Sequence, residues 1–243
     1  MKKLINNFLN LFGYKISNLD FIYDSNLNLI NTIKQKKINT VIDVGANEGQ
    51  FATKIINSGF EGNIISFEPL SSAHRKLLNI VKSFKNHNKV NWIAEKRMAI
   101  GNKNKKTIIN ISGNSESSSI LKILPKHTSL KPTSITVGKE DVMMKKMDNY
   151  LDLVSKQNGP YLLKIDTQGY EMEVLKGSKN ILNIVSYLLV EVSLVELYQG
   201  QKLLKDILDF LSKKNFKIWS IDRVMGNKKT GQTYQLDIFF YKI

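Results

Sequence analysis

The sequence contains no cysteine and only 3 histidines among its 243 residues. Without cysteine there are no disulfide bonds, thiolate metal sites, iron–sulfur clusters or cysteine nucleophiles. The histidines, His74, His87 and His127, stand far apart along the chain, which argues against a histidine metal site. We therefore predict no metal centre. The composition is compatible with a reducing compartment, and we expect a cytoplasmic protein.

The chain also lacks a long hydrophobic run, because no apolar stretch reaches the ~18 residues needed to span a bilayer. The N-terminus carries Lys2 and Lys3 and then apolar residues at helical spacing, without a cleavage site typical of a signal peptide: Leu4, Ile5, Phe8, Leu11 and Phe12. This pattern predicts an amphipathic helix that packs on the domain or on a second subunit of a homodimer. The alternative is peripheral contact with the inner face of the membrane.

Arginine is scarce, although the formal net charge is +15. Only Arg75, Arg97 and Arg223 contribute to the 36 basic residues, and the lysines are scattered. Arginine favours the reading of base edges, whereas dispersed lysine attracts phosphate without regard to sequence. We expect no DNA partner, and an RNA partner remains the weaker alternative to a solvated lysine surface.

Strand and helix signals alternate over most of the chain. Short β-branched or apolar runs predict strands, and the segments between them have helical patterns over residues 48–58, 71–84 and 203–211. The predicted strands are Thr40–Val44, Asn63–Phe67, Val90–Glu95, Tyr161–Ile165 and Ser186–Val192. This alternation is typical of a parallel α/β sheet, here over residues 38–243, with residues 1–37 as a helical appendage.

The last two predicted strands, Phe216–Ile221 and Tyr234–Tyr241, have no helix between them and therefore form an antiparallel edge pair. The whole chain predicts seven core strands with the last one reversed. In the middle, Thr107–Ile111 has a strand pattern, and residues 114–119 and 126–137 have loop patterns. Ser71 or Ser72 is expected to cap the second helix, and Asp148 a helix that ends at Ser155.

The segment DVGANEG, residues 43–49, ends a strand and opens a helix. A dinucleotide fingerprint has a second glycine where this chain has Asn47, and that glycine lets a pyrophosphate approach the backbone. Glu48 adds a negative charge at the helix N-terminus, where it would repel an anion. The loop therefore favours a ligand with a cationic end, such as S-adenosylmethionine.

Two further acidic positions support a nucleoside ligand at the same edge of the sheet. Glu68 ends the second strand, about 20 residues after the glycine loop, where an acid can bind both hydroxyls of a ribose. Asp166 follows the apolar strand YLLKI, at the carboxyl edge where ligands bind in open α/β sheets. Glu191 stands inside the apolar run LLVEVS and must be paired or lie at the ligand end of its strand.

At these residues the chain resembles the FkbM family of S-adenosylmethionine-dependent methyltransferases. The resemblance covers roughly residues 38 to 242 and rests on seven segments in order: VIDVGANEGQFA, FEP, AIG, SSSI, MKKMDNYL, LLKIDTQGYEMEVLKG and LVEVS. Members usually have Thr-Leu-Asp where this chain has Lys146, Met147 and Asp148, so that element fits less closely. The resemblance implies a Rossmann-like class I methyltransferase fold and an O-methyltransferase acting on a polyketide or sugar hydroxyl, including surface polysaccharides.

The resemblance also implies roles for particular residues. Asp43, Gly45, Asn47 and Gly49 would line the methionine end of the cofactor, and Glu68 would hold its ribose. Met98 and Ala99 would border the adenine, and Asp166 would lie where the methyl group meets the acceptor. The product would be S-adenosylhomocysteine.

The resemblance leaves the catalytic base open. Asp166, Glu171, Glu191 and His127 are the candidates, and we favour a carboxylate of the Asp166–Glu171 segment because it lies at the ligand edge. His127 is expected in an exposed loop. A divalent cation held by Asp166, Glu171 and Glu191 is a less favoured alternative.

The polar segment from Asn114 to Glu140 is expected to select the acceptor, as long loops near active sites often do. Its lysines would suit an acidic glycan. The competing hypothesis is an RNA methyltransferase that holds its substrate on the basic surface.

Overall fold

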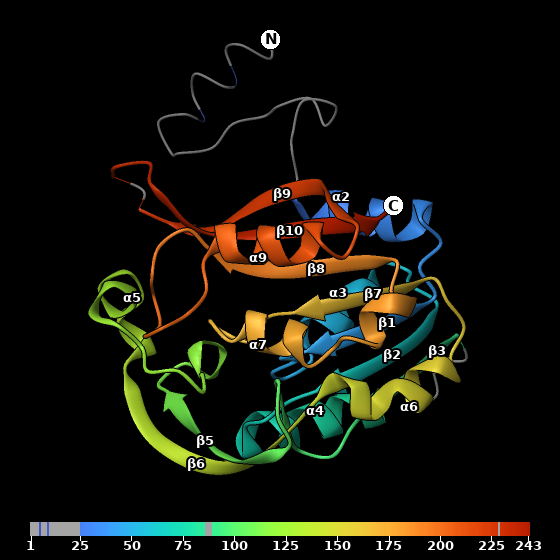
Figure 1. Cartoon of the computed structure of the whole chain (residues 1–243), viewed down its shortest axis with the longest axis horizontal. Helices are drawn as coiled ribbons and strands as arrows, with labels where there is room; N and C mark the ends of the chain where they lie inside the picture. Colours follow the sequence, from blue (N-terminus) through green and yellow to red (C-terminus); the bar gives the residue numbers. More distant parts are fainter. Residues whose placement is uncertain (1–4, 6–8, 10–24, 86–88, 228) are drawn as a thin grey trace.

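The predicted strands form one seven-stranded sheet in the computed structural model, which describes residues 5, 9, 25–85, 89–227 and 229–243 (Figure 1). The strands are β1 (Thr40–Val44), β2 (Gly62–Phe67), β3 (Val90–Ala94), β7 (Tyr161–Ile165), β8 (Tyr187–Ser193), β9 (Phe216–Gly226) and β10 (Thr233–Lys242). Their order in the sheet is β3-β2-β1-β7-β8-β10-β9. Every neighbouring pair from β3 to β8 is parallel, which confirms the predicted α/β sheet.

The reversed strand is β10, which pairs antiparallel with both β8 and β9. A short turn joins β9 to β10, and a connection of that length can only reverse the chain. The prediction of seven strands with the last one reversed is therefore confirmed.

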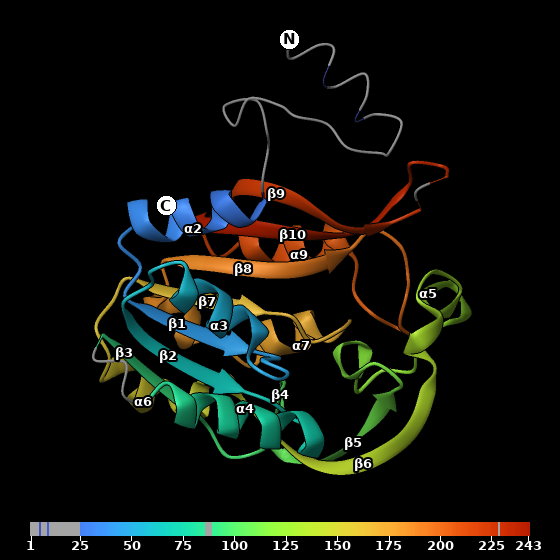
Figure 2. The ribbon, with the colours of Figure 1, turned by 180° about the vertical axis from the view of Figure 1, so that it is seen from behind.

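Helices cover both faces of the sheet (Figures 1 and 2). One face carries α2 (Ser25–Gln35), α3 (Gln50–Asn57) and α4 (Ser71–Ser83), and the other carries α6 (Leu151–Ser155), α7 (Glu171–Lys176), α8 (Ile181–Ile184) and α9 (Leu204–Ser212). Ile55 and Leu77 pack with Ile64 on the first face, and Leu175 packs with Leu163 on the second. Burial on both sides explains why the central strands are apolar at nearly every position.

A second sheet of three strands stands beyond the carboxyl ends of the main strands, and the sequence patterns predict only one of its strands, Thr107–Ile111, which is confirmed within β5 (Figure 1). It consists of β4 (Ala99–Ile100), β5 (Lys105–Ser112) and β6 (Thr136–Lys145), in the order β4-β6-β5. The residues between β5 and β6 are not the predicted loops. They contain η2 (Ser115–Ser117), α5 (Pro125–Leu130) and η3 (Pro132–Ser134), and both prolines begin a helix, where a missing N–H costs nothing.

Two predicted helix caps are wrong because the side chains bind elsewhere. Ser71 donates from its backbone N and its Oγ to the carboxylate of Glu140, each at 2.7 Å, and so ties α4 to β6. Asp148 Oδ1 accepts hydrogen bonds from the backbone N of Asn180 (2.9 Å) and Ile181 (3.0 Å), so it caps α8 instead of its own helix.

The predicted N-terminal amphipathic helix lies outside the described residues, apart from Ile5 and Leu9. The homodimer, the peripheral membrane contact and the boundary at residue 37 therefore stay predictions. Of the described helices, none has the length and apolarity that crossing a membrane requires.

Candidate functional site

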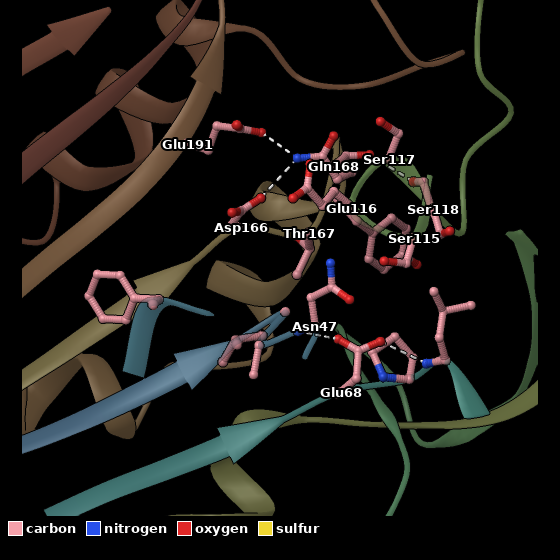
Figure 3. Close-up of a pocket in the computed structure, with 18 of the residues that line it drawn as sticks. Asn47, Glu68, Ser115, Glu116, Ser117, Ser118, Asp166, Thr167, Gln168 and Glu191 are labelled. Atoms are coloured by element: carbon pink, nitrogen blue, oxygen red, sulfur yellow. Dashed lines mark hydrogen bonds between the residues drawn. The ribbon is translucent and has the colours of Figure 1, made fainter. Parts of the chain in front are cut away.

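A cavity of about 650 Å³ opens at the carboxyl ends of β1, β2, β7 and β8, in the size range of small-molecule sites. Its far side is formed by residues 115–134, the cavity-wall segment, which connects β5 to β6 (Figure 3). The position agrees with the general location of ligands in open α/β sheets.

The two glycines of the DVGANEG loop have different roles. Gly45 has a φ of +82°, and a Cβ atom there would lie 1.8 Å from the backbone oxygen of Asp166, so the loops after β1 and β7 touch at a point where no side chain fits. Gly49 lies outside the cavity lining, and a Cβ atom there would approach Leu77 and Trp92 at 3.0 Å. Gly49 therefore serves the packing of α3, away from the position that the resemblance implies.

Asn47 projects a side chain into the cavity that lacks protein partners (Figure 3). Within the described part of the chain, neither its Nδ2 nor its Oδ1 has a hydrogen-bond partner, although both atoms are buried. A buried amide without partners is costly, and such an exception calls for an explanation such as a ligand that donates and accepts hydrogen bonds.

Glu68 joins the loops that follow β1 and β2. Its Oε2 accepts the backbone N–H of Asn47 (2.7 Å) and its Oε1 accepts that of Leu70 (2.8 Å). The side chain lines the cavity, and burial raises its pKa to about 7. Each carboxylate oxygen keeps a further lone pair, so Glu68 can also accept hydroxyl groups of a ligand.

Glu48, by contrast, points away from the cavity. Its carboxylate lies 2.6 Å from the Lys76 ammonium, and it is not among the lining residues. The expectation that Glu48 repels an anion at the helix N-terminus is therefore wrong, because the structure gives its charge another partner.

Asp43 lies beneath the cavity floor instead of lining it. Lys164, which does line the cavity, places its Nζ 3.1 Å from Asp43 Oδ1 and 3.5 Å from Asp166 Oδ2. Burial lowers the pKa of Lys164, but the Asp43 and Asp166 carboxylates outweigh this effect and raise the pKa above its ordinary value. The floor of the cavity thus carries a fixed positive charge between two negative ones.

Glu171, one of the three candidate catalytic acids, serves the loop after β7. Its Oε1 accepts the backbone N–H groups of Thr167 and Gly169, each at 3.0 Å, and the hydroxyl of Thr167 at 3.2 Å. Burial raises its pKa to about 7. The residue does not line the cavity, so the structure favours a positioning role over direct chemistry.

Asp166 and Glu191 both line the cavity and share one partner, Gln168, that the sequence analysis did not single out (Figure 3). Gln168 Nε2 donates to Asp166 Oδ1 at 2.9 Å and to Glu191 Oε2 at 2.7 Å. Gln168 has a φ of +55°, a rare conformation for a residue with a side chain. The sequence signals were its place before Gly169 and within the segment LLKIDTQGYEMEVLKG, which supports the family resemblance.

The apolar part of the lining contains Met98 and Ala99, both buried, together with Phe67. Met98 Sδ contacts the hydroxyl of Tyr150, and the ring of Tyr150 packs edge-on against Phe67 with centroids 4.9 Å apart. An apolar surface of this kind can accept an aromatic base, and the adenine position that the resemblance implies stays a prediction.

His127 is buried in the cavity-wall segment, with 2% of its surface exposed, so the expectation of an exposed loop histidine is wrong. Its Nδ1 lies 2.7 Å from Ser134 Oγ and its Nε2 lies 3.3 Å from the hydroxyl of Tyr198. That hydroxyl also donates to Gln168 Oε1 at 2.7 Å. Burial lowers the pKa of His127 to about 4, so the ring is neutral at pH 7 and connects the wall to Gln168.

The described residues contain no group of three or more histidine, aspartate or glutamate side chains arranged to hold a metal ion. The trio of Asp166, Glu171 and Glu191 fails because Glu171 turns toward backbone N–H groups.

Comparison with known protein families matches the methyltransferase FkbM domain to residues 43–218. A search of curated proteins finds no match. Among solved structures, methyltransferase FkbM from Methylobacillus flagellatus KT is similar with a TM-score of 0.51 and 14% identity, covering 92% of this chain and 46% of that one. The chain thus spans less than half the length of this relative, with which it shares the Rossmann-like class I methyltransferase fold.

Two other solved methyltransferases are also similar. Magnesium protoporphyrin IX methyltransferase from Synechocystis PCC 6803, with bound S-adenosylmethionine, has a TM-score of 0.48 and 8% identity, with coverage of 100% of this chain and 97% of that one. A putative tRNA (m1A22) methyltransferase from Streptococcus pneumoniae has a TM-score of 0.47 and 9% identity, with coverage of 91% and 71%.

Proposed function

This chain belongs to the FkbM methyltransferase family, and we propose that it is an S-adenosylmethionine-dependent O-methyltransferase acting on a hydroxyl of a saccharide, such as a surface polysaccharide or glycan, or of a related small molecule. The observation that carries the proposal is the buried amide of Asn47, which has no hydrogen-bond partner among the described residues and stands in a cavity lined by carboxylates. Such a site suits a ligand that is cationic at one end and rich in hydrogen-bonding groups.

The cavity residues fit S-adenosylmethionine in chemistry. Asp166 offers a negative charge to the ammonium and sulfonium groups, and Glu68 offers lone pairs to the ribose hydroxyls. Asn47 would gain partners for both its amide atoms. Met98 and Ala99 present an apolar surface to the adenine, and Gly45 lines the same cavity.

When bound, S-adenosylmethionine supplies an electrophilic methyl group. The chain supplies alignment, since a fixed orientation of two reactants contributes about 7–11 kcal/mol to lowering a barrier. The rigid elements for this purpose are the loops after β1 and β7, which touch at Gly45 and Asp166.

The acceptor would bind between these loops and the cavity-wall segment. That side of the cavity is lined by Ser115, Ser117, Ser118 and Ser119, of which Ser118 and Ser119 use their hydroxyls in hydrogen bonds to the backbone. A hydroxyl-rich compound such as a saccharide matches this surface, because each of its groups would find donors and acceptors. Lys131 is paired with Glu116 at 3.0 Å, which reduces its attraction for an acidic acceptor.

The cofactor assignment is tested by calorimetric titration of S-adenosylmethionine, with NAD as the control ligand. We expect micromolar binding of S-adenosylmethionine only, weakened at least tenfold in Glu68→Ala. The matched control is Glu61→Ala, an exposed glutamate paired with Lys89 on the surface. Binding of NAD, or no binding of either ligand, would contradict the proposal.

The acceptor is then sought with S-adenosylmethionine carrying a tritiated methyl group. Oligosaccharides, sugar nucleotides and total RNA are offered in parallel to the same preparation. Label in an alkali-stable ether of a saccharide supports the proposal. Label in RNA alone would replace it with the alternative that the charge of +15 permits.

A further inference from the structure

Three carboxylates converge near the ends of β7 and β8, but their oxygens are not equally free. We propose that Glu191, through its Oε1 atom, accepts the proton of the acceptor hydroxyl during methyl transfer. The proposal rests on the function proposed above and deepens it by naming the base. It departs from the sequence-based preference for the Asp166–Glu171 segment.

The hydrogen bonds of Glu191 leave one oxygen available. Gln168 Nε2 (2.7 Å) and Gln235 Nε2 (3.0 Å) are the donors that the described residues provide, and both reach Oε2. Glu191 lines the cavity and is 9% exposed, and the described residues provide no hydrogen bond to its other oxygen, Oε1. The carboxylate is thus fixed by one oxygen and free at the other.

The other two carboxylates are less suited to take a proton. Glu171 Oε1 accepts hydrogen bonds from three donors of the loop after β7, and the residue does not line the cavity. Both oxygens of Asp166 are engaged, because Oδ1 accepts a hydrogen bond from Gln168 Nε2 and Oδ2 lies 3.5 Å from the Lys164 ammonium.

The environment of Glu191 favours the protonated form of its carboxyl group. Burial and the neighbouring carboxylates raise its pKa well above the ordinary value. A base with a raised pKa takes a proton more readily at neutral pH. The titratable groups that face Glu191 are Asp166, Asp237 and Glu171, which raise its pKa, Lys164, which lowers it, and Tyr198, whose pKa Glu191 in turn raises.

Gln168 and Gln235 hold this carboxylate in place. Gln168 is itself fixed, because its Oε1 accepts the Tyr198 hydroxyl while its Nε2 bridges Asp166 and Glu191. The bridging amide keeps two negatively charged groups in one site and prevents either from turning away. Gln168 is therefore a positioning residue for the base.

The step balances without any further reactant. The hydroxyl O–H bond breaks, its electron pair stays on oxygen, and the proton passes to Glu191 Oε1. The oxygen forms its bond to the methyl carbon as the carbon–sulfur bond breaks and that electron pair stays on sulfur. The positive charge lost from the sulfonium is offset by the negative charge lost from Glu191, so the cavity keeps its net charge.

The decisive variant is Glu191→Gln. Its amide oxygen can still accept from Gln168 and Gln235, while the group facing the cavity becomes an NH₂ that cannot take a proton. We expect kcat for the acceptor found by the tritium screen to fall at least about 100-fold, in line with the usual contribution of a general base. The affinity for S-adenosylmethionine, measured by calorimetry, is expected to stay within threefold.

Two further measurements separate a base from a structural residue. Wild-type kcat should fall as pH drops below the raised pKa of Glu191, and Glu191→Gln should lose this limb of the profile. In ¹³C NMR, the carboxyl signal that disappears in Glu191→Gln should titrate above the ordinary glutamate value of about 4.3. Glu191→Asp retains a carboxylate and should recover part of the lost rate, and Glu61→Gln serves as the surface control.

The outcomes distinguish this proposal from the one before it. If wild type binds no S-adenosylmethionine or methylates no hydroxyl, the proposed function fails. If wild type is active and Glu191→Gln retains kcat within threefold, Glu191 is not the base. The same conclusion follows if kcat of Glu191→Gln depends on pH in the same way as kcat of wild type.

Discussion

Lys164 Nζ lies 3.1 Å from Asp43 Oδ1, and the two residues are direct neighbours in the parallel register of β7 and β1. The pair is buried, and it links the two strands whose following loops make the floor of the cavity. The attraction between these two charges holds the two strands together beneath the cavity floor. An apolar pair at the same positions would do so by packing alone.

Lys164→Met is expected to lower the free energy of unfolding by about 3–5 kcal/mol, because it leaves the Asp43 carboxylate buried without its countercharge. Urea denaturation measures the loss, and Asp43→Asn combined with Lys164→Met should recover part of it. Lys205→Met removes an exposed lysine 2.6 Å from Asp209 and should leave the midpoint unchanged. Equal effects of Lys164→Met and Lys205→Met would contradict the prediction.

Gly45→Ala should abolish binding of S-adenosylmethionine and destabilise the fold. The added methyl group would collide with the backbone oxygen of Asp166 at the contact of the two cavity loops. Gly200→Ala is the matched control, since Gly200 has a similar φ of +75° but open space around it, so it carries the strain of positive φ without the collision. Calorimetry and thermal melting compare the two, and a Gly45→Ala variant that binds as well as Gly200→Ala would refute the contact.

Tyr198→Phe should loosen the cavity-wall segment. The Tyr198 hydroxyl bonds Gln168 Oε1 at 2.7 Å and the Ser117 backbone oxygen at 3.1 Å, and its removal leaves buried acceptors unpaired at a cost of about 1–3 kcal/mol. Hydrogen–deuterium exchange should show faster exchange over residues 115–134. Tyr187→Phe provides the control, because the ring of Tyr187 packs on Phe239. Equal exchange over residues 115–134 in both variants would contradict the prediction that the Tyr198 hydroxyl anchors the cavity-wall segment.

Glu171→Gln should gain stability relative to wild type as pH rises. Burial raises the pKa of Glu171 to about 7 in the folded protein, from 4.5 in the unfolded chain, so the folded state binds more protons between these values. The contribution of Glu171 to the free energy of unfolding of wild type is therefore fully present below pH 4.5 and is lost as pH rises through 7. Between pH 4.5 and pH 8, the difference between variant and wild type should change by about 3 kcal/mol in favour of the variant. Chemical denaturation at several pH values measures it, and a difference independent of pH would refute the shift.

The main sheet was predictable from the sequence because its strands are short apolar runs that end at glycine or acidic loops. TVIDV and YLLKI are buried on both faces, and that burial favours apolar residues at all but the paired positions Asp43 and Lys164. The short turn before β10 likewise determined its reversal. The second sheet was not predictable, because β4 has only two residues and β6 alternates weakly, so its pairing depends on contacts far apart in the chain.

The sequence predicted the site residues whose position at the end of a strand brings them to the cavity. It did not predict which side chains turn away from the cavity toward another partner. Asn47, Glu68 and Asp166 line the cavity as the strand ends indicate. Asp43 and Glu171 do not, because a partner turns each of them away: Lys164 for the first and the loop N–H groups for the second. Gln168 escaped notice because its importance lies in three simultaneous hydrogen bonds.

The cavity has two parts that come from different regions of the chain. Its floor comes from several loops of the main sheet, whereas its wall is the cavity-wall segment between β5 and β6, which are neighbouring antiparallel strands. The two parts are joined by hydrogen bonds, because Ser119 Oγ donates to the backbone oxygen of Gln168 and the Tyr198 hydroxyl bonds Ser117 and His127. If the proposed function holds, we expect a swap of residues 113–135 for the corresponding stretch of another family member to change acceptor preference only where the new stretch keeps these contacts with the floor.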